Sequence, residues 1–239
     1  MYYSFRVLSK KIIEMKIDSK SLYGVKQAKL YLKDKKMQAA HGLFAGVDEA
    51  GVGPLAGPVI AAAVVFDFRK KMFTANSRNG WLQEINDSKK LTHEKREYLL
   101  KFVIKHALAF GIGISSVAEI DRINILQSRL IAMKRAIENL RKIPKIVFVD
   151  GNRSIPNLQI QQRLIVRGDE KVFSIAAASI LAKVTRDNIL KNLHKQFPQY
   201  GFDRHKGYGT QFHFEMIQKY GPSEVHRKSF APIKSLLSR

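Results

Sequence analysis

Apolar and polar positions form two kinds of segment along the chain from Phe44 onward. Short runs bounded by Gly, Pro or Asp predict strands, at residues 44–48, 58–66, 109–116, 145–151 and 161–169, of which the first two are expected to be buried. Longer runs with helical periodicity predict helices, at residues 91–108 with Thr92 as N-cap, 117–140 and 171–197. Because helices join most of the strands, we expect an α/β fold, a mixed sheet flanked by helices.

The amino-terminal part of the chain differs from the rest. Residues 1–43 are basic, include helix-like stretches such as SLYGVKQAKLYLKDKKM and carry no site-like motif. One interpretation is an accessory extension or a misassigned start codon. The other is an arm that binds nucleic acid. No repeat and no linker rich in Pro, Gly or Ser divides residues 44–239. We therefore expect one domain after a basic extension, in a monomeric protein.

The charge balance indicates the kind of partner. The 239 residues include 42 Lys and Arg against 20 Asp and Glu, a formal net charge of +22. So large a basic excess favours a polyanion, usually nucleic acid, because each neutralised phosphate releases counterions. Association with ribosomes, binding to a membrane surface and a generally basic proteome are the alternatives.

Cysteine usage and hydropathy exclude several classes of protein. The chain has no Cys, which rules out disulfides, thiolate catalysis and cysteine-ligated zinc and fits a reducing cytosol. No apolar stretch approaches the ~20 residues that cross a bilayer. The amino terminus lacks the apolar core of a signal peptide. The expected location is cytoplasmic, with no membrane partner.

Acidic residues stand at positions where strand ends gather. Asp48 and Glu49 end one predicted strand and Asp150 ends another, each before or near a Gly. On the helix 171–197, Asp187 lies on one stripe with two polar residues at spacings of four, namely Ser179 and Lys183. Taken singly, these acids are explained by turn hydrogen bonds or a helix surface. Together they predict a site at the sheet edge.

Clustered carboxylates repel one another and need a cation. Without Cys and without a His-rich ligand pattern, oxygen ligands indicate Mg²⁺ or Mn²⁺. Three histidines, His205, His213 and His226, form no defensible ligand pair by spacing. A basic chain with such a cluster favours two-metal hydrolysis of phosphodiesters.

Five motifs occur in order along residues 44–234: VDEAGVGPLAGPV, NDSKKLTHEKR, VDGN, GDEKVFSIAAASILAKVTRD and YGFDRHKGYGTQFH…YGPSEVHRKSFAPI. They resemble the successive motifs of bacterial ribonuclease HII. The resemblance implies a ribonuclease H-like fold with a helical carboxy-terminal part. It also implies metal-dependent endonucleolytic cleavage of the RNA strand of RNA–DNA hybrids and of single ribonucleotides in duplex DNA, leaving 5′-phosphate and 3′-hydroxyl ends, in the cytoplasm.

The resemblance also assigns residues. It implies that Asp48, Glu49 and Asp150 are the primary ligands of Mn²⁺ or Mg²⁺ and that Asp187 completes the second metal position. The backbone of Gly51, Val52 and Gly53 reads the ribose 2′-hydroxyl, the group that distinguishes RNA from DNA.

Five further substrate positions follow from the same resemblance. Tyr208 stacks at the junction sugar, and Ser179, Lys183, Lys89 and Lys90 lie near the phosphates. Without the resemblance, Tyr208 is equally an ordinary loop aromatic, and the two adjacent lysines are equally a solvated pair at a helix start.

One position departs from the family pattern. The glycine loop reads Gly-Val-Gly where the family has Gly-Arg-Gly, so Val52 removes a charged contact to phosphate. This leaves a catalytically weakened homologue that binds hybrids as the alternative function. The four acids argue against it, since clustered negative charge disfavours a pure phosphate binder. A basic ribosome-associated protein would leave the five motifs unexplained.

Overall fold

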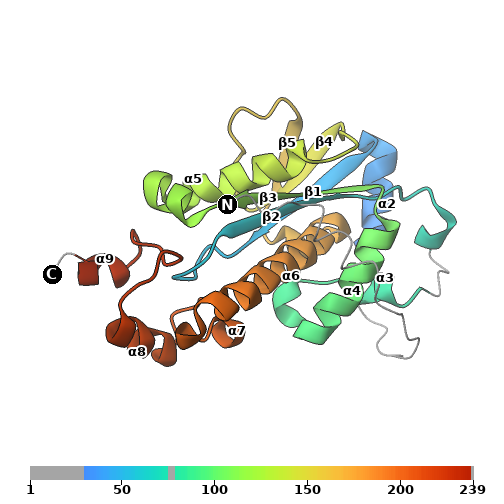
Figure 1. The fold of residues 1–239 in the computed structure, drawn as a ribbon. Coiled ribbons are helices and arrows are strands. Elements are labelled where there is room, and N and C mark those ends of the chain that lie inside the picture. Colours follow the sequence, from blue (N-terminus) through green and yellow to red (C-terminus); the bar gives the residue numbers. More distant parts are fainter. Residues whose placement is uncertain (1–29, 75–78, 238–239) are drawn as a thin grey trace.

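A mixed sheet forms the centre of the molecule (Figure 1). The structure is a computed structural model that describes residues 30–74 and 79–237. The sheet has five strands in the order β3-β2-β1-β4-β5. Their bounds are β1 Phe44–Ala50, β2 Val59–Val65, β3 Ala109–Ser115, β4 Ile146–Asp150 and β5 Gln161–Ile165. The first three are antiparallel neighbours, and β4 and β5 add in parallel beside β1. The α/β fold expected from the sequence is confirmed.

Helices cover both faces of this sheet. α5, Val117–Glu138, packs on one face, whereas α6, Phe173–Gln196, and α4, His93–His106, pack on the other (Figure 1). Thr92 caps α4 as predicted, accepting from Lys95 N at 3.3 Å. The expected continuous helix of α5 is interrupted at Asn124, which has a φ of 66°. The remaining elements are α2 Leu30–His41, α3 Trp81–Glu84, α7 Phe202–His205, α8 Gln211–Tyr220 and α9 Ile233–Leu237, with 3₁₀ turns η1 Lys71–Phe73, η2 Ser88–Lys90, η3 Gly168–Glu170 and η4 Pro198–Tyr200.

Small residues let the helices approach the sheet closely. All seven residues of β2, VIAAAVV, are buried. A Cβ at Gly46 would overlap the backbone of Ser174 in α6, and one at Gly113 would overlap the backbone of α5. Every second residue of a strand faces the same side. Asp48 therefore shares the α6 side with Phe44, and Glu49 shares the α5 side with Val47.

α2 is joined to the core through a buried carboxylate. Asp34 accepts hydrogen bonds from Phe173 N at 3.1 Å, Ser174 N at 2.9 Å and Ser174 Oγ at 2.8 Å. It thus satisfies free backbone N–H groups in the first turn of α6. Tyr31 of α2 also enters the core. Residues 1–29 of the predicted extension lie outside the described residues. In the part of the chain that the structure describes, no helix has the length and apolarity to span a bilayer.

Removing the Asp34 carboxylate is expected to destabilise the fold. Asp34→Ala leaves buried donors of Phe173 and Ser174 unpaired, at a cost of about 1–3 kcal/mol in unfolding free energy. Burial raises the pKa of Asp34 from 3.8 to about 6, so its ionisation opposes folding and parent stability falls as pH rises through that window. The cost of Asp34→Ala is therefore larger near pH 4 than near pH 8. Urea unfolding of the parent and of Asp34→Ala at both pH values measures this loss of unfolding free energy, with Asp34→Asn as control. A loss that is equal at pH 4 and pH 8 would contradict the prediction.

Candidate active site

Two acids lie side by side where the pairing of β1 with β4 ends. The strands are parallel and Val47 lies opposite Val149, so Asp48 and Asp150 follow at adjacent positions. Asp48 Oδ1 accepts from Glu49 N at 2.7 Å. Asp150 Oδ1 accepts from Gly168 N at 2.6 Å, which ties the end of β4 to η3. The sheet therefore gathers the three strand-end acids of the prediction.

The electrostatics of these acids are unfavourable without a cation. Burial raises the pKa of Asp48 well above its usual range, and the charges of Glu49, Asp150 and Asp169 raise it further. Burial also raises the pKa of Glu49, against the opposing charge of Arg129 on α5. Buried like charges of this kind are stabilised by a positive ion.

One side-chain oxygen of Glu49 is free to bind a cation among the described residues. Its Oε1 lies 3.4 Å from Arg129 Nε, whereas its Oε2 is buried and has no hydrogen-bond partner. A buried carboxylate oxygen without a partner is unfavourable, and oxygen donors suit Mg²⁺ or Mn²⁺. Among residues 30–74 and 79–237, no three His, Asp or Glu side chains are grouped as a ready cage. The oxygen donors of these acids thus suit Mg²⁺ or Mn²⁺ by their chemistry.

Asp169 is a further acid at this place that the sequence reasoning missed. It is buried in η3 and lies 3.7 Å, through Oδ2, from Lys89 Nζ. Burial and the charges of Asp87 and Asp150 raise its pKa, and Lys89 opposes them. The signal was present in the sequence, because Asp169 ends the predicted strand 161–169 just as Asp150 ends another.

Asp187 has different surroundings. It is buried on α6, and its Oδ1 lies 2.8 Å from Lys183 Nζ. Its Oδ2 lies 3.9 Å from an Arg96 nitrogen on α4. Its partners are therefore cations of this chain, and it is absent from the main charges that raise the pKa of Asp48.

Two of the predicted substrate residues, Tyr208 and Lys183, lie near the glycine loop (Gly51, Val52 and Gly53). A Cβ added at Gly53 would lie 4.0 Å from Tyr208 Cε1, and Lys183 Nζ lies 5.9 Å from the centre of the Tyr208 ring. Tyr208 is 45% exposed. Gly53 and Lys183 thus both lie close to an accessible aromatic ring.

Two other predicted substrate residues, Ser179 and Lys90, are engaged within the protein. Ser179 Oγ lies 2.7 Å from Ser88 Oγ, and both residues are buried. Lys90 Nζ pairs with Glu170 Oε1 at 2.7 Å. Lys89 remains highly exposed next to Asp169.

Two buried arginines, which the sequence reasoning missed, hold the glycine loop. Gly51 has a φ of +96°, and a Cβ there would overlap the Arg186 side chain. Arg186 donates to the carbonyls of Pro58, Ala56 and Lys206 at 3.0–3.2 Å. Arg227 donates to Gly51 O at 2.6 Å and Val52 O at 2.9 Å. The carbonyls of Gly51 and Val52 are therefore held in place by Arg227.

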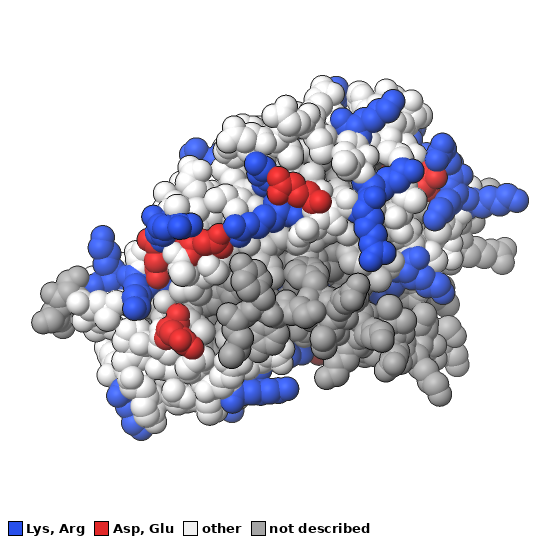
Figure 2. All heavy atoms as spheres, turned by 45° about the horizontal axis from the view of Figure 1, so that its top comes forward, with Lys and Arg blue, Asp and Glu red and all other residues white. Residues whose placement is uncertain are grey.

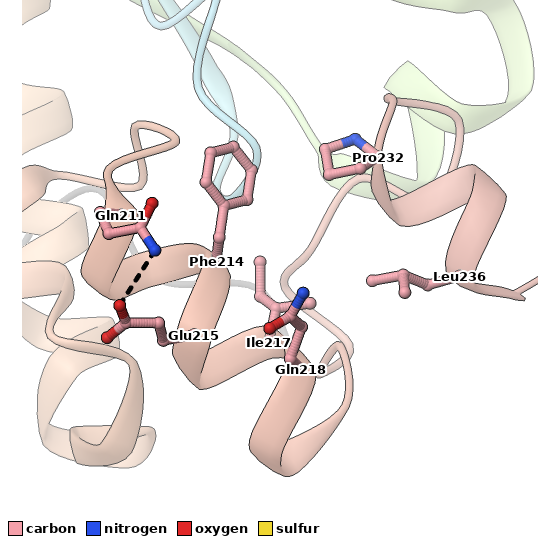
Figure 3. Close-up of a pocket in the computed structure, with 7 residues that line it drawn as sticks. All are labelled: Gln211, Phe214, Glu215, Ile217, Gln218, Pro232 and Leu236. Atoms are coloured by element: carbon pink, nitrogen blue, oxygen red, sulfur yellow. Dashed lines mark hydrogen bonds between the residues drawn. The ribbon is translucent and has the colours of Figure 1, made fainter.

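Two further features of the described surface are its Lys and Arg side chains and an apolar hollow. Figure 2 shows Lys and Arg side chains spread over one face, as the net charge of +22 requires. A hollow of about 330 Å³ lies between α8 and α9. Figure 3 shows its lining, Gln211, Phe214, Glu215, Ile217, Gln218, Pro232 and Leu236. None of the residues predicted for the site belongs to it.

Comparison with solved structures defines the class of protein. Ribonuclease H2 from Pyrococcus horikoshii OT3 is 26% identical, with a TM-score of 0.66 over 82% of this chain and 98% of that one. Bst-RNase HIII in complex with Mn²⁺ has the same TM-score of 0.66 at 16% identity, over 82% of this chain and 69% of that one, and shows the fold alone. The sheet with acids at its strand ends is that of a ribonuclease H-like protein.

Comparison of sequences defines the family. The chain matches the family Ribonuclease HII over residues 45–233. Ribonuclease HII of Caldicellulosiruptor bescii is 48% identical over 207 residues, 87% of this chain and 94% of the relative. Ribonuclease HII of Delftia acidovorans is 51% identical over 197 residues, 82% and 79% respectively. The chain belongs to the ribonuclease HII family and is a hydrolase of the endoribonuclease class. These relatives give no support to a weakened hybrid-binding homologue.

Proposed function

We propose that this protein cleaves the RNA strand of RNA–DNA hybrids, and single ribonucleotides embedded in duplex DNA, leaving 5′-phosphate and 3′-hydroxyl ends. The main support is the buried cluster of acids at the strand ends, in which one oxygen of Glu49 has no hydrogen-bond partner. The chain also belongs to the ribonuclease HII family. A net charge of +22 suits a nucleic-acid substrate.

The acids that would hold Mg²⁺ or Mn²⁺ are Asp48, Glu49, Asp150 and, in place of the predicted Asp187, Asp169. Support comes from the mutual charge effects among Asp48, Asp150 and Asp169. When bound, such ions activate water and stabilise the leaving oxygen. Asp187 instead holds Lys183 beside Tyr208.

Recognition of the ribonucleotide belongs to the surface around the glycine loop. The carbonyls of Gly51 and Val52 are taken by Arg227, so the loop is rigid before substrate arrives. Its backbone meets the 2′-hydroxyl, and the exposed ring of Tyr208 stacks on the junction sugar. Lys183 and Lys89 contribute positive charge to the phosphates. Phosphate contacts position the duplex, while the loop reads the sugar.

A duplex with one embedded ribonucleotide tests this function. We expect cleavage at that nucleotide in Mn²⁺ or Mg²⁺, none after addition of a chelator, and none of an all-DNA duplex of the same sequence. A continuous RNA–DNA hybrid should also be cut. Binding without cleavage in either metal would contradict the proposal.

Substituting Arg at Val52 is expected to tighten substrate binding. Val52 is half-buried and offers no charge to phosphate. A charge-assisted hydrogen bond is worth about 1.5–3 kcal/mol, so Val52→Arg should lower KM by roughly ten- to hundredfold at low salt. The gain should shrink as salt rises. Steady-state kinetics at two salt concentrations, with Val52→Gln as the uncharged control, measure the change. Equal KM values for parent and Val52→Arg would mean that the loop has adapted to valine.

A further inference from the structure

A buried histidine pair lies directly behind the exposed tyrosine, and the proposed reaction does not use it. His213 on α8 and His226 near the chain end are both fully buried. Their Nε2 atoms are 3.1 Å apart. His205 stacks on His213 with ring centres 4.4 Å apart, and its Nδ1 accepts from Gly207 N at 3.2 Å. Histidines therefore contact the backbone at two consecutive positions, Gly207 and Tyr208.

The groups that flank the histidine pair, the donor Ser223 N and the acceptor Tyr208 O, fix the direction of each hydrogen bond. Ser223 N donates to His226 Nδ1 at 3.0 Å, and a neutral His226 then carries its proton on Nε2. That proton is donated to His213 Nε2. The remaining proton of His213, on Nδ1, is donated to Tyr208 O at 2.9 Å. One continuous chain of hydrogen bonds runs from Ser223 to the backbone of Tyr208.

This chain requires both imidazoles to be neutral. A second proton on His213 would place its Nε2–H against that of His226, and a second proton on His226 would place Nδ1–H against Ser223 N–H. Burial and neighbouring histidines lower the pKa of His226 to about 4. Burial likewise lowers the pKa of His213 to about 4. Both rings are therefore neutral at neutral pH, and the whole chain of hydrogen bonds from Ser223 to Tyr208 is formed.

The same carboxy-terminal segment also reaches the glycine loop. Arg227, next to His226, donates through its side chain to Gly51 O at 2.6 Å and through its backbone N to Leu55 O at 2.8 Å. Leu55 N in turn donates to Gly207 O at 2.8 Å. Consecutive residues of one segment thus contact the loop on one side and, through His213, the tyrosine on the other.

We infer that His213 is a positioning residue for Tyr208, that His226 orients His213, and that the pair sets the place of the tyrosine ring relative to the glycine loop. The inference rests on the proposed role of both elements in ribonucleotide recognition. A displacement of about 1 Å in a substrate-positioning group can lower a rate by a hundredfold. Loss of the bond to Tyr208 O should therefore lower kcat/KM on an embedded ribonucleotide by about ten- to hundredfold.

Two amide substitutions separate positioning from packing. An Asn amide nitrogen can take the place of Nδ1, so His213→Asn keeps the donor to Tyr208 and loses the acceptor for His226. A Gln amide reaches the place of Nε2, so His213→Gln keeps that acceptor and loses the donor to Tyr208. His213→Asn leaves the buried N–H of His226 Nε2 unpaired, whereas in His213→Gln the Tyr208 carbonyl keeps its hydrogen bond from Thr210 N at 2.9 Å. We therefore expect the larger decrease in Tm for His213→Asn. Only His213→Gln should lose about ten- to hundredfold in kcat/KM.

A double-mutant comparison completes the test. In a Tyr208→Ala background, which itself should be impaired, His213→Gln should cause no further loss, because it acts through the absent ring. Equal losses for His213→Asn and His213→Gln would overturn the inference, as would a full additional loss in Tyr208→Ala. An unimpaired Tyr208→Ala would overturn it too, while leaving metal-dependent cleavage standing. Absence of cleavage by the parent protein would instead reject the proposed function.

Discussion

Asp48→Asn is expected to abolish cleavage of a duplex with one embedded ribonucleotide while leaving the fold intact. Asp48 is buried among Glu49, Asp150 and Asp169, so its carboxylate is central to the proposed metal site. Loss of several kcal/mol of charge stabilisation in the transition state corresponds to a decrease of about a thousandfold or more in rate. Single-turnover cleavage in saturating Mn²⁺ measures it.

The stability of the same variant provides an independent check. The pKa of Asp48 is raised in the folded protein, by burial first, so at neutral pH its ionisation opposes folding. Asp48→Asn should therefore unfold, without metal, at the same or a higher urea concentration than the parent. Glu138→Gln, on the surface of α5, is the matched control and should change neither property. Near-parent cleavage by Asp48→Asn would contradict the assignment.

The pattern of the sequence was sufficient for the elements of the sheet. Runs such as VIAAAVV have no polar position and therefore indicated a strand buried on both faces, as β2 is. The pattern could not reveal that α2 belongs to the same packing unit. That contact depends on Asp34 meeting the first turn of α6 across more than a hundred residues, and a single Asp in a basic helix carries no sign of it.

The strand-end acids were predictable for a physical reason. Asp48 and Asp150 follow apolar runs directly, and adjacent parallel strands place such ends together. The environment of Asp187 was not predictable in this way. Its spacing from Lys183 correctly placed both on one stripe of α6, but its second partner, Arg96, comes from α4. Only the tertiary structure shows that this acid is compensated by cations.

The two buried arginines next to the glycine loop could not be predicted from the sequence. Arg186 and Arg227 read as ordinary basic residues in a chain with 42 Lys and Arg. Both are fully buried; Arg227 donates to Gly51 O in the loop, and Arg186 donates to Ala56 O just after it. Their role depends on where the loop carbonyls lie, which no local pattern encodes.

Asp169→Asn and Asp187→Asn are both expected to lower activity, but they should differ in metal dependence and in stability. Asp169 shares its charge environment with Asp87 and Asp150, so Asp169→Asn removes a proposed ligand. It should raise the half-saturating Mn²⁺ concentration and lower cleavage by about a hundredfold or more, since metal-site losses are worth several kcal/mol. Its stability without metal should be unchanged or higher, because burial and like charge raise the pKa of Asp169.

Asp187→Asn should instead lower stability and leave the metal dependence unchanged. The substitution leaves Lys183 and Arg96 without their shared carboxylate, and breaking a buried ion pair costs about 3–5 kcal/mol in unfolding free energy. Its metal dependence should stay at the parent value, and its loss of activity should appear in KM, because Lys183 no longer stays beside Tyr208. Mn²⁺ titrations of cleavage measure the half-saturating metal concentration of each variant. Urea unfolding measures the unfolding free energy of each. A shifted Mn²⁺ dependence in Asp187→Asn with none in Asp169→Asn would restore Asp187 as the fourth ligand.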